Sequence, residues 1–151
     1  MSSTYQRSKA QKRNNREFQA KLDKITNYLV EADWHTNYTS RTVVTDGIIN
    51  NSVPSDAYSE LEFFRTPGGG LRAEVSYIGR DGNLITEETI VGVQPFEKTF
   101  YMIELANTGI GFGKIDMRSG NLRITLLETF ASPENSALGI YEYTRSAAHS
   151  I

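Results

Sequence analysis

The chain of 151 residues contains no cysteine and only two histidines. The lack of cysteine excludes disulfides, thiolate nucleophiles and metals held by sulfur ligands. His35 and His149 are far apart in the sequence, so a histidine-based metal site within one chain is not expected. The sequence therefore predicts no metal site, and it leaves the identity of any cofactor unknown.

Long apolar runs are also missing. No stretch approaches the ~18 apolar residues that are needed to span a membrane, and apolar residues make up 38% of the chain. The N-terminus begins polar and basic, without the apolar segment of a secretory signal. These features predict a globular domain with no membrane span and a cytoplasmic location.

Positive charge is concentrated at the N-terminus. Residues 1–24 contain seven Lys or Arg and two acidic residues, whereas the remainder contains nine basic and sixteen acidic residues. A basic arm of this kind can bind nucleic acid or an acidic partner. A solvated leader on an acidic domain is the favoured interpretation, because the segment lacks the interleaved aromatic residues of a single-strand binder.

Residues 1–14 have almost no apolar content and are predicted to be a disordered basic leader. Apolar residues at helical spacing then run from Phe18 to Val30, which predicts an amphipathic helix from Asn15 to about Ala32. Such a helix is not stable alone, so its apolar stripe must pack on the rest of the chain.

Two alternating runs joined by a four-residue turn organise the remaining chain. Gly109 to Met117 and Leu122 to Phe130 flank the turn 118–121, which is the pattern of a β-hairpin. Similar runs joined by short Gly, Pro and Asn turns extend it into eight strands. These are 34–45, 58–65, 71–78, 83–93, 98–105, 109–117, 122–130 and 137–145. Residues 46–57 are predicted to be mainly loop, with a short strand at 47–49 as the alternative.

The predicted fold is mainly β, an antiparallel up-and-down eight-stranded meander with one N-terminal amphipathic helix in a single domain, residues 15–151. Short connections exclude crossover helices, so sequence neighbours pair. A closed barrel is favoured because closure removes two exposed edges. Closure would bring Trp34 and Arg145 to one rim, with the guanidinium over the indole and bonded to carbonyls of the chain leading from the helix.

Glycine is abundant at 109–113, where it alternates with larger residues. The segment resembles a phosphate-binding loop only superficially, because it does not run from a strand into a helix. Glycine at a bend, or at a close approach to a ligand or to the N-terminal helix, is the better interpretation.

Strand alternation assigns one set of side chains to the interior. Most are apolar, but Glu87, Lys114, Glu128 and Glu142 share their parity. A solid core would avoid buried charges, which cost several kcal/mol without partners. These residues therefore suggest a polar or wet end of a cavity that orients a ligand. Positions near strand ends, or a bulge that reverses the parity, are the alternative explanation.

The sequence predicts binding of a hydrophobic or amphiphilic small molecule by a monomer or homodimer. Candidate ligand contacts are the aromatic Tyr77, Tyr101 and Phe112 and the charged Lys114, Arg123, Glu128 and Glu142. The alternative is a small barrel enzyme, an isomerase, cyclase or lyase, in which Glu128, Glu142 or Glu87 transfers protons. The spacing of these acidic residues is not that of a known catalytic motif. No Ser, Thr or Tyr is accompanied by a His or Lys that could activate it as a nucleophile.

Trp34 at the start of the first strand, Arg145 at the end of the last, and a helix beside an eight-stranded meander resemble the lipocalin-like (calycin) barrels. In that superfamily a Trp entering the first strand often packs against an Arg from near the last strand. Here Ala32 replaces the Gly of the lipocalin signature, and the helix precedes the barrel. The segment from Trp34 to Thr42 is also similar to the opening of the bilin lyases, barrels that carry a tetrapyrrole.

Overall fold

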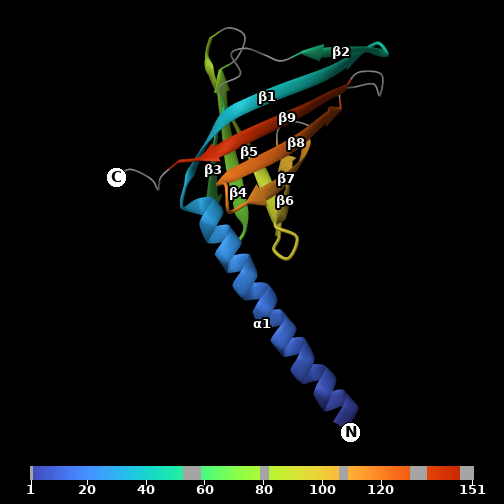
Figure 1. Cartoon of the computed structure of the whole chain (residues 1–151), viewed down its shortest axis with the longest axis vertical. Coiled ribbons are helices and arrows are strands. Elements are labelled where there is room, and N and C mark those ends of the chain that lie inside the picture. Colours follow the sequence, from blue (N-terminus) through green and yellow to red (C-terminus); the bar gives the residue numbers. More distant parts are fainter. Residues whose placement is uncertain (1, 53–58, 79–81, 106–108, 130–135, 147–151) are drawn as a thin grey trace.

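The computed structural model describes residues 2–52, 59–78, 82–105, 109–129 and 136–146. These residues form one helix and nine strands, and the helix leaves one end of the sheet (Figure 1). The elements are α1 (Ser2–Val30), β1 (Asp33–Thr45), β2 (Ile48–Ser52), β3 (Ser59–Arg65), β4 (Leu71–Ile78), β5 (Leu84–Gln94), β6 (Thr99–Glu104), β7 (Ile110–Asp116), β8 (Asn121–Thr129) and β9 (Ser136–Arg145).

Strands β1 and β3 to β9 form a closed antiparallel barrel in which each strand lies beside its sequence neighbour. β1 closes it by pairing with β9 from Trp34 to Val44 and with β3 from Asp33 to His35. The predicted mainly β, eight-stranded closed meander is confirmed, and the predicted strand ends agree with the observed ones to within about two residues. Predicted strand residues Tyr58 and Phe130 lie outside the described residues.

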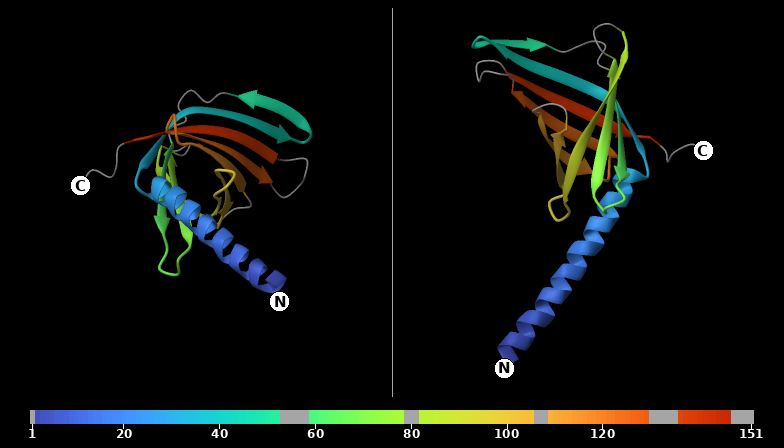
Figure 2. Two further views of the ribbon diagram at one scale, coloured as in Figure 1. Left: turned by 60° about the horizontal axis from the view of Figure 1, so that its bottom comes forward. Right: turned by 180° about the vertical axis from the view of Figure 1, so that it is seen from behind.

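The ninth strand, β2, lies outside the meander and pairs with the end of β1, residues 41–45. Asp46 and Gly47 both have positive φ, as a tight hairpin turn requires. The segment predicted to be mainly loop therefore contains a longer strand than the alternative at 47–49. One edge of β1 has two partners in turn: it pairs with β3 up to His35 and with β2 from Arg41 onward. The barrel widens away from α1 (Figures 1 and 2).

Helix α1 begins at Ser2, earlier than the predicted start at Asn15. Residues 2–14 contain no Gly or Pro and many good helix formers, so the helix continues beyond its apolar stripe. This part is helical in the structure, and disorder of residues 1–14 stays a prediction. It projects away from the barrel (Figure 1), and the side chains of residues 11–20 are exposed. Packing on the barrel involves the last turns, where Ile25 and Leu29 are buried.

The last turn of α1 seals one end of the barrel around Trp34 and Arg145, which are register partners. The buried indole Nε1 donates to the carbonyl of Leu29 at 3.2 Å, and Arg145 Nη2 donates to the carbonyl of Tyr28 at 3.4 Å. The guanidinium lies 4.4 Å from the centre of the Tyr28 ring, which packs edge-on against Trp34. The predicted meeting at one rim is confirmed, but the stacking partner is Tyr28, because the helix places this ring between the two.

The glycines of β7 make room for side chains of β6. Gly111 and Gly113 face inward, and a Cβ on Gly113 would lie 2.1 Å from the Phe100 ring. A Cβ on Gly111 would meet nothing closer than 3.5 Å. The close approach expected at this segment is therefore made by side chains of the neighbouring strand. Because the glycines turn inward, Ile110, Phe112 and Lys114 of β7 face outward.

Replacing Gly113 by Ala should destabilise the barrel by about 1 to 3 kcal/mol, because the new methyl overlaps the Phe100 ring in a filled core. Gly111→Ala is the matched control, since it lies on the same strand and face but has space. It should change the unfolding free energy by less than about 1 kcal/mol. Urea unfolding of both variants measures the difference, and equal effects would contradict the packing described.

The contact between Tyr28 and Arg145 should appear as coupling in a double-mutant cycle of Tyr28→Leu and Arg145→Met. Its expected size is about 0.5 to 2 kcal/mol. The hydrogen bond from Arg145 goes to the backbone carbonyl of Tyr28, so it persists in Tyr28→Leu and does not enter the coupling. Additive losses of unfolding free energy would show that the ring and the guanidinium do not interact.

Candidate functional site

The barrel interior has a sealed half and an accessible half. Near α1, the inward side chains of Phe63, Phe100 and Leu122 are at most 1% exposed. Toward the other end, inward residues are only partly buried, namely Val75, Tyr77, Ile85, Glu87, Glu104 and Leu126. An inward side chain of a closed barrel meets solvent only near an open end or where the strands separate. The half of the interior away from α1 is therefore open to solvent.

Tyr77 and Glu87 come from the hairpin of β4 and β5. They share a face with the buried residues Ala73 and Val91, which fixes their direction. The Tyr77 hydroxyl donates to Glu87 Oε1 at 3.1 Å. The inward parity predicted for both residues is confirmed, and together they place a polar pair in the accessible half.

Glu104, at the end of β6, is a third polar residue on this face and was missed in the sequence. It pairs with the buried Thr89, and its carboxylate lies over Gly109, where a Cβ would be 2.5 Å from the carboxyl carbon. Apolar residues occupy both parities of β6, so alternation could not identify the inward set. The glycine at 109 was the available signal, because it marks a side chain packed against bare backbone.

A cluster of hydroxyl groups lies inside the barrel around Tyr143, the inward residue of β9 that precedes Arg145. Ser59 Oγ and the Tyr143 hydroxyl are 2.9 Å apart, and Thr36 Oγ1 donates to the carbonyl of Ser59 at 2.5 Å. Burial raises the pKa of Tyr143 to about 12, and the hydrogen bond with Ser59 only partly opposes this effect. The phenol is therefore neutral at physiological pH and acts as a hydrogen-bonding group.

Several predicted site residues face outward. Tyr101 is 39% exposed and Phe112 62% exposed, and Lys114 lies on the same outer face of β7. Arg123 Nη1 is 3.7 Å from Glu142 Oε1, also on the outside. The inward parity predicted for Lys114 of β7 and Glu142 of β9 is therefore wrong. As ligand contacts these residues stay predictions, but the structure does not bring them to the accessible interior.

The parity was misassigned because inward glycines admit neighbouring rings. A Cβ on Gly139 would lie 2.6 Å from the Tyr141 ring, just as Gly113 admits Phe100. At Gly113 and Gly139 the inward position therefore carries no side chain, and the larger residues next to each glycine in sequence face outward. Among the predicted catalytic candidates, Glu142 is thereby separated from the inward Glu87. Glu128 pairs with Ala137, but its side chain lies outside the described part of the structure, so proton transfer stays a prediction.

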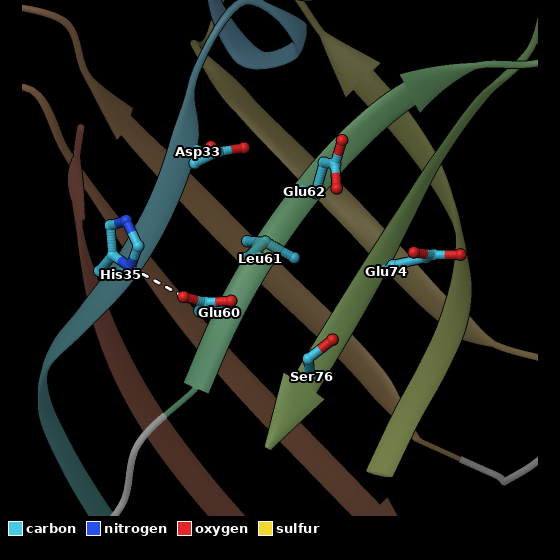
Figure 3. A pocket seen from close by; sticks show the side chains of 7 residues that line it. All are labelled: Asp33, His35, Glu60, Leu61, Glu62, Glu74 and Ser76. Atoms are coloured by element: carbon cyan, nitrogen blue, oxygen red, sulfur yellow. Dashed lines mark ion pairs between the residues drawn. The ribbon is translucent and has the colours of Figure 1, made fainter. Parts of the chain in front are cut away.

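A second concave surface lies outside the barrel, on β1, β3 and β4 (Figure 3). It is a pocket of about 170 Å³ lined by Asp33, His35, Glu60, Leu61, Glu62, Glu74 and Ser76. His35 Nδ1 lies 3.4 Å from Glu60 Oε1, and both side chains are almost half exposed. Among the described residues, no three His, Cys, Asp or Glu are arranged to hold a metal ion. With one apolar residue in its lining, this pocket is a poor match to small-molecule sites.

Two further observations bear on the predicted membrane and nucleic-acid partners. No helix among the described residues has both the length and the apolar character needed to cross a bilayer. The projecting part of α1 presents Lys12, Arg13 and Arg16 to solvent. Binding of nucleic acid by this basic segment stays a prediction.

A scan against protein-family models and a search of curated proteins found no match. Among solved structures, the siderocalin Ex-FABP, which functions through dual ligand specificities, aligns with a TM-score of 0.50 and 8% identity. The alignment covers 80% of this chain and 76% of that chain. Aphrodisin, a sex pheromone from female hamster, aligns over 80% of this chain and 78% of its own, with a TM-score of 0.41 and 11% identity.

The likeness to the siderocalin concerns the fold, because the sequence identity is low. It agrees with the strand order and closure described above. The chain therefore has the lipocalin-like barrel fold that Trp34 and Arg145 suggested, with its helix at the N-terminal side.

The raised pKa of Tyr143 predicts a pH dependence of stability. Because the phenol ionises near pH 10 when unfolded and at about 12 when folded, the unfolded state releases its proton first, and stability is lost as pH rises from about 10 to 12. The loss should be on the order of 2 to 3 kcal/mol. Urea unfolding across this range should show a steeper decline for the wild type than for Tyr143→Phe. Parallel declines would mean that Tyr143 ionises freely.

Proposed function

We propose that this chain binds one hydrophobic or amphiphilic small molecule in the accessible half of its barrel. The observation that carries the proposal is the contrast between the two halves of the interior. The residues near α1 form a filled core, whereas Val75, Ile85 and Leu126 face inward and keep contact with solvent. Apolar inward side chains left partly exposed provide the surface that an apolar ligand would cover.

The polar residues of the same half supply the means of orienting a ligand. Tyr77 and Glu87 form a hydrogen-bonded pair on one wall, and Glu104 lies on the adjacent strand. A few polar groups within a mainly apolar lining are typical of small-molecule sites. A ligand with an apolar body and one polar end fits this arrangement, with its polar end near the Tyr77 and Glu87 pair.

The fold gives independent support. Lipocalin-like barrels commonly hold one small ligand inside eight strands, and the aligned siderocalin is a protein with dual ligand specificities. In this chain α1, Trp34 and Arg145 seal one end. Ligand entry would therefore occur at the opposite end, where β1 leaves β3.

Filling the accessible half should abolish binding. Val75→Trp places an indole inside the barrel, whereas Ser76→Trp, one residue along on the outer face, is the matched control. Binding of the amphiphilic fluorophore 1-anilinonaphthalene-8-sulfonate should weaken by about tenfold or more in Val75→Trp and stay unchanged in Ser76→Trp. Leu126→Trp tests the same space from β8, and circular dichroism checks the fold of each variant.

Two results would contradict the proposal. The first is probe binding that survives both inward substitutions in folded protein. The second is binding that is lost in Phe112→Glu but kept in Val75→Trp, because the probe would then lie on the outer face of the barrel. Native mass spectrometry of protein purified from its own source would identify a ligand that remains bound.

A further inference from the structure

The outer face of the barrel from β5 to β9 is strongly apolar. Eight large side chains there are 39% to 62% exposed. They form what we call the outer apolar patch, which comprises Ile90, Tyr101, Ile103, Leu105, Ile110, Phe112, Leu127 and Leu138. The other outward positions of β5 to β9 in the same rows of paired residues, Gly92, Thr125 and Ile140, are also uncharged, although solvent-facing positions of a sheet are normally polar. The interior site does not explain these side chains.

The strand register makes the patch continuous. Ile90 pairs with Ile103, and Ile103 pairs with Ile110. The same row continues through Leu127 to Leu138. Directly paired side chains on one face lie about 5 Å apart, so this row crosses five strands without a gap. Tyr101 and Phe112 form a second row beside it.

The patch is preformed. A Cβ on Gly92 would lie 2.0 Å from the Tyr101 ring, so this ring lies against the bare backbone of β5. Ile and Leu on adjacent strands pack beside it and restrict one another. A surface that is already ordered loses little conformational entropy when it is covered.

The size of the patch matches a protein interface. Exposed by these fractions, eight side chains of this kind present on the order of 700 Å² of apolar surface. The largest apolar patch of a typical monomer is about 300 to 600 Å². A stable complex of ordinary size covers about 800 Å² on each partner. The patch alone therefore supplies most of one side of a stable interface.

We propose that this outer apolar patch packs against the same patch of a second copy of the chain. Two sheets pack well face to face at about 10 Å, with their strands rotated by roughly 30°. A two-fold axis through the patch would make the contact self-complementary and closed. The patch lies on the outer face of the barrel and the proposed ligand site on its inner face, so ligand binding and dimer formation are tested separately.

The charges around the patch favour a protein partner over a membrane. Arg72 and Glu88 are paired at 3.1 Å at one border, and Arg123 and Glu142 at 3.7 Å at the other, next to Lys114. Charges of both signs form the usual polar rim of a protein interface. An anionic membrane would instead require a surplus of basic residues beside the apolar surface.

Sedimentation equilibrium of the full chain tests the proposal over about 0.1 to 100 μM, where interfaces of this size begin to dissociate. The wild type should be a dimer, and Phe112→Glu should raise the dimer dissociation constant by about 30-fold or more. Leu127→Glu should act in the same direction from the neighbouring strand. Ile78→Glu is the matched control, because Ile78 is an apolar residue of β4, 50% exposed, outside the patch. It should leave the dimer intact.

A wild type that stays monomeric throughout this range would overturn the proposal. So would equal dissociation by Ile78→Glu, or a dimer that survives both patch variants in folded form. Co-sedimentation with phosphatidylcholine vesicles containing about a third phosphatidylserine tests the other class of partner. Monomeric protein that binds these vesicles through Phe112 would assign the patch to a lipid surface and would also overturn the dimer.

Discussion

The barrel depends on the pairing of β1 with two strands that are distant from each other in sequence. β1 joins β9 along most of its length and β3 through three residue pairs near α1. Without these ladders the other strands would form an open sheet with two unpaired edges. The same strand carries Trp34, which holds the end of α1 against the barrel through Leu29. Closure of the sheet and sealing of one end are therefore consequences of where β1 starts.

The division of the interior follows from this arrangement. At the end sealed by α1, aromatic and branched side chains fill the space between opposite walls, and the rings of Phe63 and Phe100 meet edge to face at 5.6 Å. At the other end, β1 exchanges β3 for β2, and the walls separate. The larger opening leaves polar residues such as Glu87 in contact with water, which removes the energetic objection to a carboxylate inside a barrel. One strand that changes partners thus accounts for both a solid core and an accessible site.

The fold could be predicted well from the sequence, and the site only in part. Turn residues and short connections identified the meander, because these signals are local, and the two exposed edges of an open sheet favoured closure. Tyr77 was placed correctly because β4 alternates between apolar and polar residues, and Glu87 because it shares the parity of Ile85 and Val91. The faces of β6, β7 and β9 could not be read in this way. On these strands some inward positions are glycines. The space beside Gly113 is filled by the Phe100 ring and the space beside Gly139 by the Tyr141 ring, so the inward residue itself carries no apolar side chain. Helix α1 was also underestimated, since intrinsic propensity extends it beyond the apolar stripe.

The ladder between β1 and β9 also has a consequence for how the chain folds. Every other pair in the meander except β1 with β3 joins consecutive strands, so these hairpins form over short loops. β1 and β9 lie near opposite ends of the chain, and bringing them together closes the longest loop in the molecule. The entropic penalty of that step is offset only when the intervening hairpins already hold the two strands close. The barrel thus closes late, and on the ribosome it cannot be completed until β9 has emerged.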